Sequence, residues 1–299
     1  MKKNITIIIA ALCVLGQTAQ AQTMQFLNIN PDPESAAVAG TGVARGANAY
    51  ALDNNMAASS LSELQFAAEV GYGMWQPKAF KEGVISAAGF AKLGEKLAIG
   101  ASFKNFGQPE YSITNADGRT MGTFKPSEMA VGLGLSCKLG DFLALGLDAK
   151  YASSSIAEEA SASSVAADVS LAYSNEGFQF GAAVANLGGK VSYGGESSYS
   201  LPAVGRVGAS YAFESLKASA QVDYLFSGGL MAGVGAEYTI EEIVSLRAGF
   251  HYGDSAKAIP THASAGLGLN FEGIRLNAAY LLASEVLGGS MMFGLSYTF

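Results

Sequence analysis

The sequence predicts an all-β protein, a 14-stranded antiparallel β-barrel that spans an outer membrane. Hydrophobic residues make up 49% of the 299 residues and charged residues only 14%, whereas soluble proteins carry roughly 25% charged residues. No stretch beyond residue 21 reaches the roughly 18 consecutive apolar residues that a membrane helix needs. From residue 65 to the end, apolar residues instead alternate with small or polar ones, which is the period of a strand.

The first 21 residues predict a signal peptide that is removed by cleavage. Lys2 and Lys3 precede an apolar stretch over residues 5–15, and Ala19-Gln20-Ala21 forms an A-x-A cleavage pattern. Loss of the two lysines changes the net charge from −7 to −9, and a chain this acidic is poorly suited to nucleic acid. Cys137 is then the only cysteine, so we expect no internal disulfide and no cysteine zinc site.

Residues 22–64 do not alternate, and we expect them to form a segment separate from the barrel, which takes residues 65–299. Gly40 and Gly42 permit close packing and unusual backbone angles. The asparagine-rich stretch 48–55 can satisfy backbone groups locally. The segment contains a run of residues that recurs in one family: Phe26, Leu27, Ile29, Pro31, Asp32, Ser35, Ala36, Gly40, Gly42, Val43, Ala44, Ala47, Asn48, Ala49, Asn55, Ala57 and Ala58.

This run resembles the opening of the PorV/PorQ family of Bacteroidetes outer-membrane proteins, which are relatives of the FadL-like barrels. The resemblance implies that residues 22–64 fold inward as a hatch at the periplasmic mouth, whereas the alternative is a disordered periplasmic leader. The hatch motif would comprise Pro31, Asp32, Ser35, Gly40, Gly42, Asn48 and Asn55. The sequence departs from the family at Glu34, usually arginine, and at Met56, usually proline.

Alternation identifies 14 strands, most of them with the length of a tilted strand crossing a bilayer. The strand at 83–92 is the weakest, because its alternation is unclear around Ala87, Ala88 and Gly89. The expected spans are 65–75, 83–92, 96–105, 128–138, 142–152, 165–174, 177–186, 203–213, 216–225, 230–240, 244–252, 262–271, 274–283 and 290–299.

The connections predict the orientation of the barrel. Tight turns alternate with mostly longer loops, of which residues 106–127 are the longest, and this asymmetry is typical of outer-membrane barrels, with short periplasmic turns. An even number of strands places both chain ends at the short-turn end. Six turns carry Glu95, Asp141, Glu176, Glu214, Glu241, Glu242 and Glu272. This acidic rim indicates either ordinary turn chemistry and solubility or docking of a basic partner.

A soluble β-sandwich also alternates apolar and polar residues, but its outer face would carry Lys and Glu more often. Here the apolar face carries aromatic residues near strand ends, which suits the interfacial girdles of a membrane barrel. These residues are Tyr151, Tyr173, Phe178, Tyr211, Phe213, Tyr224, Tyr238, Tyr252 and Phe271. The last residues, with Gly294, Tyr297 and Phe299, resemble the barrel assembly signal of outer-membrane proteins.

The lumen-facing positions carry charges of both signs, and buried charges need partners. We expect cross-strand pairs and contacts with the hatch, which fill the barrel or, alternatively, line a path for a solute. The charges are Glu69, Lys104, Lys138, Asp148, Lys150, Asp168, Arg206, Lys217, Asp223, Glu237, Arg247 and Arg275. His251, His262 and Ser264 share the lumen face without a sign of activation, so we expect no catalytic residues, no metal site and no cofactor.

Three functions follow from this reading. The resemblance implies a part in the type IX secretion system, in which such barrels bind the C-terminal domains of cargo and pass them to attachment components, through loops 106–127, 153–164 and 187–202. The alternative is a FadL-like transporter of hydrophobic small molecules, with an apolar pocket near the hatch and a break in the strand wall. Its entry would involve Met74, Trp75, Phe80, Phe106, Tyr111, Met121 and Phe124. A structural barrel in outer-membrane lipid is the third.

Overall fold

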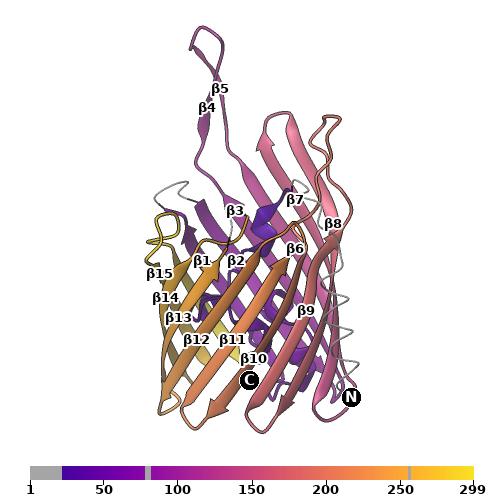
Figure 1. The fold of residues 1–299 in the computed structure, drawn as a ribbon, viewed down its shortest axis with the longest axis vertical. Helices are drawn as coiled ribbons and strands as arrows, with labels where there is room; N and C mark the ends of the chain where they lie inside the picture. The colour runs from indigo at the N-terminus through magenta and orange to yellow at the C-terminus, as the bar shows by residue number, and fades with distance from the viewer. Residues whose placement is uncertain (1–21, 78–81, 255–256) are drawn as a thin grey trace.

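A computed structural model describes residues 22–77, 82–254 and 257–299, so the expected signal peptide and Phe80 lie outside the described residues. Fourteen strands close into one antiparallel barrel in which β1 pairs with β16 (Figure 1). The barrel strands are β1 (Phe66–Trp75), β2 (Glu82–Leu93), β3 (Leu97–Gly107), β6 (Ser127–Lys138), β7 (Leu143–Ala157), β8 (Ala160–Asn175), β9 (Phe178–Gly188), β10 (Val204–Phe213), β11 (Leu216–Leu225), β12 (Leu230–Ile240), β13 (Val244–Gly253), β14 (His262–Phe271), β15 (Ile274–Leu282) and β16 (Met291–Thr298).

Every expected strand is present, and the alternation sorts side chains as expected. On β16, Phe293 and Tyr297 are 47% and 49% exposed and face outward, whereas Met292 and Ser296 are buried. An outward apolar surface is stable only against lipid, and closure leaves no strand edge unpaired there. The barrel therefore lies in the outer membrane.

Strand β2, whose alternation is unclear in the sequence, is an unbroken strand with apolar residues on both faces. Ile85 points outward, while Val84 and Phe90 are buried on the lumen side. Phe90 packs in a cluster with Leu52 and Met56 from the N-terminal segment. Apolar residues on both faces obscure the alternation, which explains why the sequence pattern is unclear at this strand.

The two ends of the barrel differ, but less simply than the sequence indicates. Connections of two to four residues join strands at one end, called the turn end here, and longer connections are common at the opposite loop end. The expectation that residues 153–164 form a loop is wrong. Strands β7 and β8 continue to Ala157 and from Ala160 and meet in a two-residue turn. Serine and alanine make up most of this stretch, which suits a strand that has left the membrane.

The longest connection also contains strands. Tyr111–Thr114 (β4) and Thr120–Phe124 (β5) pair as a separate hairpin that stands above the loop end (Figure 1). The upper part of the β7–β8 hairpin projects beside it. The hydroxyl of Tyr111 donates to the carbonyl of Ile156 at 3.3 Å and joins the two projections.

The N-terminal segment consists of short helices joined by tight turns and lies against the lumen side of the strands. The helices are η1 (Gln25–Asn28), α2 (Pro33–Ala37), η2 (Gly42–Ala44), α3 (Ala51–Asn54) and α4 (Ala58–Leu61). Among the described residues, no helix is long and apolar enough to cross a membrane.

The segment runs through much of the length of the lumen. Gln22 bridges to Ser200 in the long β9–β10 connection, while Ser60 in α4 accepts a hydrogen bond from Ser136 toward the turn end. The first described residues therefore lie at the loop end, where Gln22 and Thr23 pair with Ser200. The sequence predicts that both chain ends lie at the turn end, and Gln22 does not fit that expectation.

Candidate functional site

The centre of the lumen holds a compact polar cluster made by the N-terminal segment. Asp32 is fully buried and its carboxylate accepts hydrogen bonds from the side-chain amides of Asn48 at 2.8 Å and Asn54 at 2.7 Å, and from the backbone N–H of Glu34 at 2.8 Å. Asn30 donates to Asn54 at 2.6 Å. Burial raises the pKa of Asp32 to about 6, and the nearby Glu34 carboxylate acts in the same direction.

The other residues of the expected hatch motif support the same turns. Gly42 passes the cluster so closely that a Cβ would lie 2.0 Å from Asn54 Oδ1, and Gly40 has a positive φ of 78°. Asn55 donates to the carbonyls of Val43 and Leu171 at 2.8 and 3.0 Å, which ties the segment to β8. Pro31, which precedes Asp32, and Ser35, three residues after it, are also buried.

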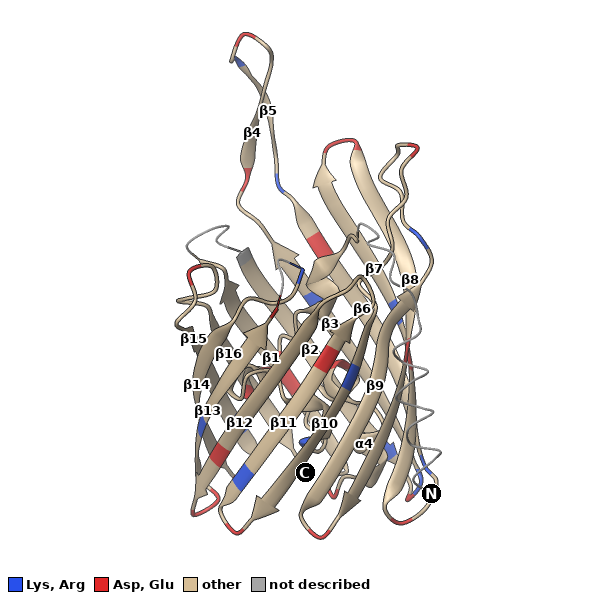
Figure 2. Ribbon diagram, in the orientation of Figure 1, with Lys and Arg blue, Asp and Glu red and all other residues tan. Residues whose placement is uncertain are grey.

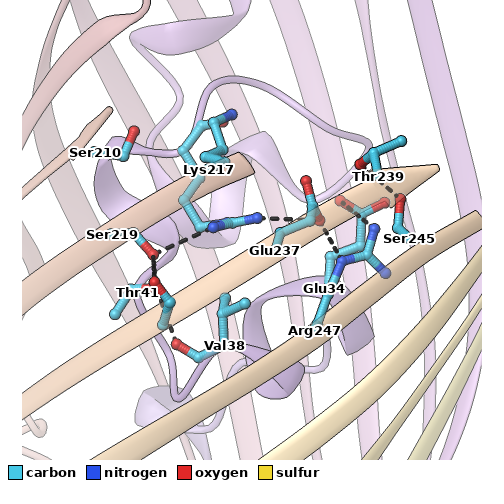
Figure 3. A network of polar contacts seen from close by, with 12 residues as sticks. Glu34, Val38, Thr41, Ser210, Lys217, Ser219, Glu237, Thr239, Ser245 and Arg247 are labelled. Atoms are coloured by element: carbon cyan, nitrogen blue, oxygen red, sulfur yellow. Dashed lines mark hydrogen bonds and ion pairs between the residues drawn. The ribbon is translucent and has the colours of Figure 1, made fainter. Parts of the chain in front are cut away.

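A network of charges joins the segment to one side of the barrel wall (Figure 3). Arg45 pairs with Glu237 on β12 at 3.1 Å. Arg247 on β13 contacts the same Glu237 and lies 3.8 Å from Glu34 in α2. The ammonium of Lys217 on β11 donates to the backbone carbonyl of Arg45 at 2.6 Å. These contacts connect α2 and the chain after η2 to three neighbouring strands.

The opposite side of the wall has its own anchor. Lys104 on β3 is buried, lies 3.4 Å from the carboxylate of Asp53 in α3, and donates to the carbonyls of Leu27 and Ile29 at 3.2 and 3.0 Å. Arg206 on β10 also donates to the carbonyl of Asp53 at 3.3 Å. Both halves of the segment are therefore held by cations of the wall.

Other lumen charges pair across neighbouring strands. Lys150 and Asp168 form a buried pair at 2.5 Å, and Arg206 and Asp223 lie 3.8 Å apart. Figure 2 shows how these charges lie along the strands, together with acidic residues in the turns of the turn end. Within the described residues, four buried atoms of the lumen charges lack a hydrogen-bond partner: Glu69 Oε1, Asp148 Oδ1, Arg206 Nε and Arg275 Nε.

The expected assembly-signal residues lie at the seam that closes the barrel. The carbonyl of Phe299 accepts hydrogen bonds from the backbone N–H groups of Gln65 and Phe66, and the rings of Phe66 and Phe299 stack at 5.4 Å. Tyr297 faces outward beside them. Gly294 faces the lumen, where a Cβ would lie 1.9 Å from Glu69 Oε1, so this glycine makes room for a buried carboxyl group.

Sequence reasoning missed several residues of the site. Arg45 is the only Lys or Arg within residues 22–64, and this isolation was the available signal for a specific partner. The two departures from the family pattern also have partners here: Glu34 contacts Arg247 and accepts from Asn277 at 3.0 Å, and Met56 is buried against glycines of the wall.

Two cavities border the segment. The larger one, of about 590 Å³, lies toward the turn end and is mainly polar, with Glu34, Arg45, Glu237 and Arg275 in its lining. The smaller one, of about 70 Å³, lies toward the loop end and is lined by Trp75, Met231, Ile259, Leu281, Met292 and both histidines. Of the expected entry residues, Trp75 therefore faces a cavity, whereas Phe106 packs on Phe26 at 5.8 Å.

Comparison with known proteins gives a family and a fold. The family model described as type IX secretion system protein PorV matches residues 16–223. The structure resembles the toluene transporter TbuX of Ralstonia pickettii, with a TM-score of 0.62, 16% identity and coverage of 89% of this chain and 97% of that chain. It also resembles the Pseudomonas putida toluene transporter TodX, with a TM-score of 0.64, 14% identity and coverage of 88% and 97%.

A FadL homologue of Pseudomonas aeruginosa has a TM-score of 0.60 and 13% identity, with 94% of this chain and 99% of that chain covered. At these identities the structural likeness establishes the fold, which is that of FadL-like outer-membrane barrels. A search of curated protein sequences finds no match.

Proposed function

Because the chain belongs to the family of type IX secretion system protein PorV, we propose that it acts in protein export at the outer membrane by binding secreted cargo or partner proteins at its loop end. The partners would be the C-terminal domains of cargo and components of the secretion and attachment machinery. The observation that carries this proposal is the pair of hairpins that project from the loop end (Figure 1).

The projections have the character of a binding surface. Met121 on β5 is 70% exposed, Tyr111 on β4 41% and Ile156 on β7 49%. These side chains lie on strands that extend beyond the barrel rather than on its lipid-facing wall. Exposed apolar residues held on ordered strands offer contact area to a protein partner at a low entropic cost.

The filled lumen supports binding rather than passage of a protein. The segment of residues 22–64 would act as a hatch, because its contacts with Lys104, Arg206, Glu237 and Arg247 join it to opposite sides of the wall. Passage of a chain would require loss of these buried ion pairs. A partner that binds at the loop end requires no such change.

The test replaces residues 111–124 by a short Gly-Ser linker in the native outer membrane. Proteins with a C-terminal sorting domain should then accumulate in the periplasm and no longer co-purify with the barrel. A matched control replaces Glu241 and Glu242 by Asn and Gly, which suit the positive φ of 50° and 60° at this turn. Normal secretion and co-purification by an assembled barrel without the hairpin would contradict the proposal.

The small cavity favours a second candidate, transport of a hydrophobic small molecule, since the structural relatives include toluene transporters. The wall offers limited support, because the pairing of the described barrel strands is irregular at only two places, a bulge between β8 and β9 and a second one near Ser155 in the projecting part of the β7–β8 hairpin. At the β8–β9 bulge, Asn186 fills the irregularity by donating its backbone N–H to Asp168 at 2.9 Å. Co-purified or radiolabelled toluene retained by the barrel, and lost on Trp75→Ala, would favour transport. If the barrel retains no toluene, the transport candidate is rejected and partner binding at the loop end remains the proposed function.

A further inference from the structure

The two histidines of the chain form a pair on the wall of the small cavity, and the proposed binding of a partner at the loop end does not use them. His251 on β13 and His262 on β14 are directly opposite in the strand register. Both face the lumen, are 7% and 5% exposed, and stack with ring centroids 4.8 Å apart and an interplanar angle of 23°. Directly opposed side chains of antiparallel strands are close enough to share one ligand.

Hydrogen bonds to backbone carbonyls define the state of both rings. His262 Nδ1 lies 2.8 Å from the carbonyl oxygen of Pro260, and His251 Nδ1 lies 3.4 Å from that of Ala39. A carbonyl oxygen only accepts, so both contacts fit the neutral tautomer in which Nδ1 carries the proton and Nε2 carries the lone pair. Metal-ligating histidines commonly donate their second ring N–H to a carbonyl in this way.

The lone-pair nitrogen of His251 has no partner. Its Nε2 is buried, without a hydrogen bond to any described residue, and leaving such an acceptor unsatisfied is costly. Both rings line the same small cavity of about 70 Å³. The lone pair of each Nε2 lies in the plane of its ring, so an ion or other electron-pair acceptor bound at the Nε2 edges of the two rings would satisfy both nitrogens.

The surroundings of the pair are soft and electrically balanced. Met231 lines the cavity, and its Sδ accepts the N–H of Ile259 at 3.3 Å while keeping a second lone pair. The charged lining residues, Arg206 and Asp223, pair with each other at 3.8 Å. Among the described residues, no group of three or more His, Cys, Asp or Glu side chains is placed to hold a metal.

We propose that His251 and His262 bind one copper(I) ion through their Nε2 atoms, with the thioether of Met231 as the third ligand. Imidazole suits copper and zinc alike, but thioether sulfur selects copper(I). A neutral site without a thiolate or free carboxylate is poorly suited to structural zinc, which usually takes four ligands. The proposal does not rest on a role in secretion, whereas the transport alternative would place its solute in the same small cavity.

The test uses the intact barrel in detergent, purified with an affinity tag that contains no histidine. Copper(I), supplied with a reductant, is titrated against a chromophoric copper(I) chelator, and zinc(II) is titrated in parallel. We expect one equivalent of copper(I) per barrel. Because the chain has only two histidines, His251→Gln and His262→Gln should each lower the affinity by at least about tenfold, and no other histidine can compensate.

A third variant tests the choice of metal. Met231→Leu should weaken copper(I) and leave any zinc(II) affinity unchanged, while Met129→Leu on β6 serves as the methionine control. Heat-modifiable migration on gels reports whether each variant is a folded barrel. The proposal is overturned if the folded wild-type barrel binds no copper(I), if binding is unchanged in the double His→Gln variant, or if zinc(II) binds more tightly than copper(I).

Discussion

Arg247 is a wall residue that joins the N-terminal segment to the barrel through Glu34. Its side chain is 6% exposed and contacts Glu237 and Glu34, and it donates to Asn277 at 3.0 Å. Arg247→Met keeps the packing volume but leaves Glu34 without its cation, while Glu237 keeps its pair with Arg45 at 3.1 Å. Removing one partner of a buried pair costs about 3–5 kcal/mol.

The lower limit applies here. The side chains of Glu34 and Glu237 are 17% and 16% exposed and border the larger cavity, where water reaches them. A loss of about 3 kcal/mol corresponds to a roughly 100-fold rise in the equilibrium for release of the segment, at about 1.36 kcal/mol per tenfold. Only the segment should respond, because the strand ladder does not use this side chain.

Hydrogen exchange of the purified barrel measures the effect. Backbone amides of residues 33–44 should lose roughly 100-fold of their protection, while strand amides keep theirs. Arg119→Met, in the exposed hairpin, is the matched control. Adding Glu34→Gln should restore part of the protection, because it removes the carboxylate that has lost its cation. Unchanged protection in residues 33–44, or a loss of protection spread evenly over the strands, would contradict the role of Arg247 in holding the segment.

Three further predictions concern the same segment and the seam of the barrel. Gly181→Leu should release the segment and expose it to protease, because a Cβ would lie 1.9 Å from the carbonyl oxygen of Val43; Gly83→Ala, with no atom within 4 Å of the added Cβ, should not. Since the pKa of Asp32 is raised to about 6, the folded segment takes up a proton as the pH falls from about 6 to about 4. Its protection, corrected for intrinsic exchange, should therefore rise over that range, and Asp32→Asn should abolish the rise. Deletion of Phe299 removes three backbone hydrogen bonds of the seam and should reduce the heat-modifiable fraction in membranes, whereas equal assembly would show that the terminal residue is dispensable.

The strands were predictable because their signal is local. Each strand must present alternate residues to lipid and lumen, so hydrophobicity alone reveals period and length, as in the row of Phe293, Leu295 and Tyr297. The signal weakened where this condition fails. On β2 the lumen is apolar, because Phe90 meets the N-terminal segment, and above the membrane β7 and β8 continue with serine and alanine in place of lipid-facing residues.

The contents of the lumen were determined by the tertiary structure. The sequence by itself indicated which charges face inward, but not that Arg45 meets Glu237 across 192 residues of chain (237 − 45) or that His251 opposes His262. Such pairings depend on strand register and on the path of the segment, which many residues determine together. Alternation is a property of each strand alone, whereas the site is a property of the closed barrel.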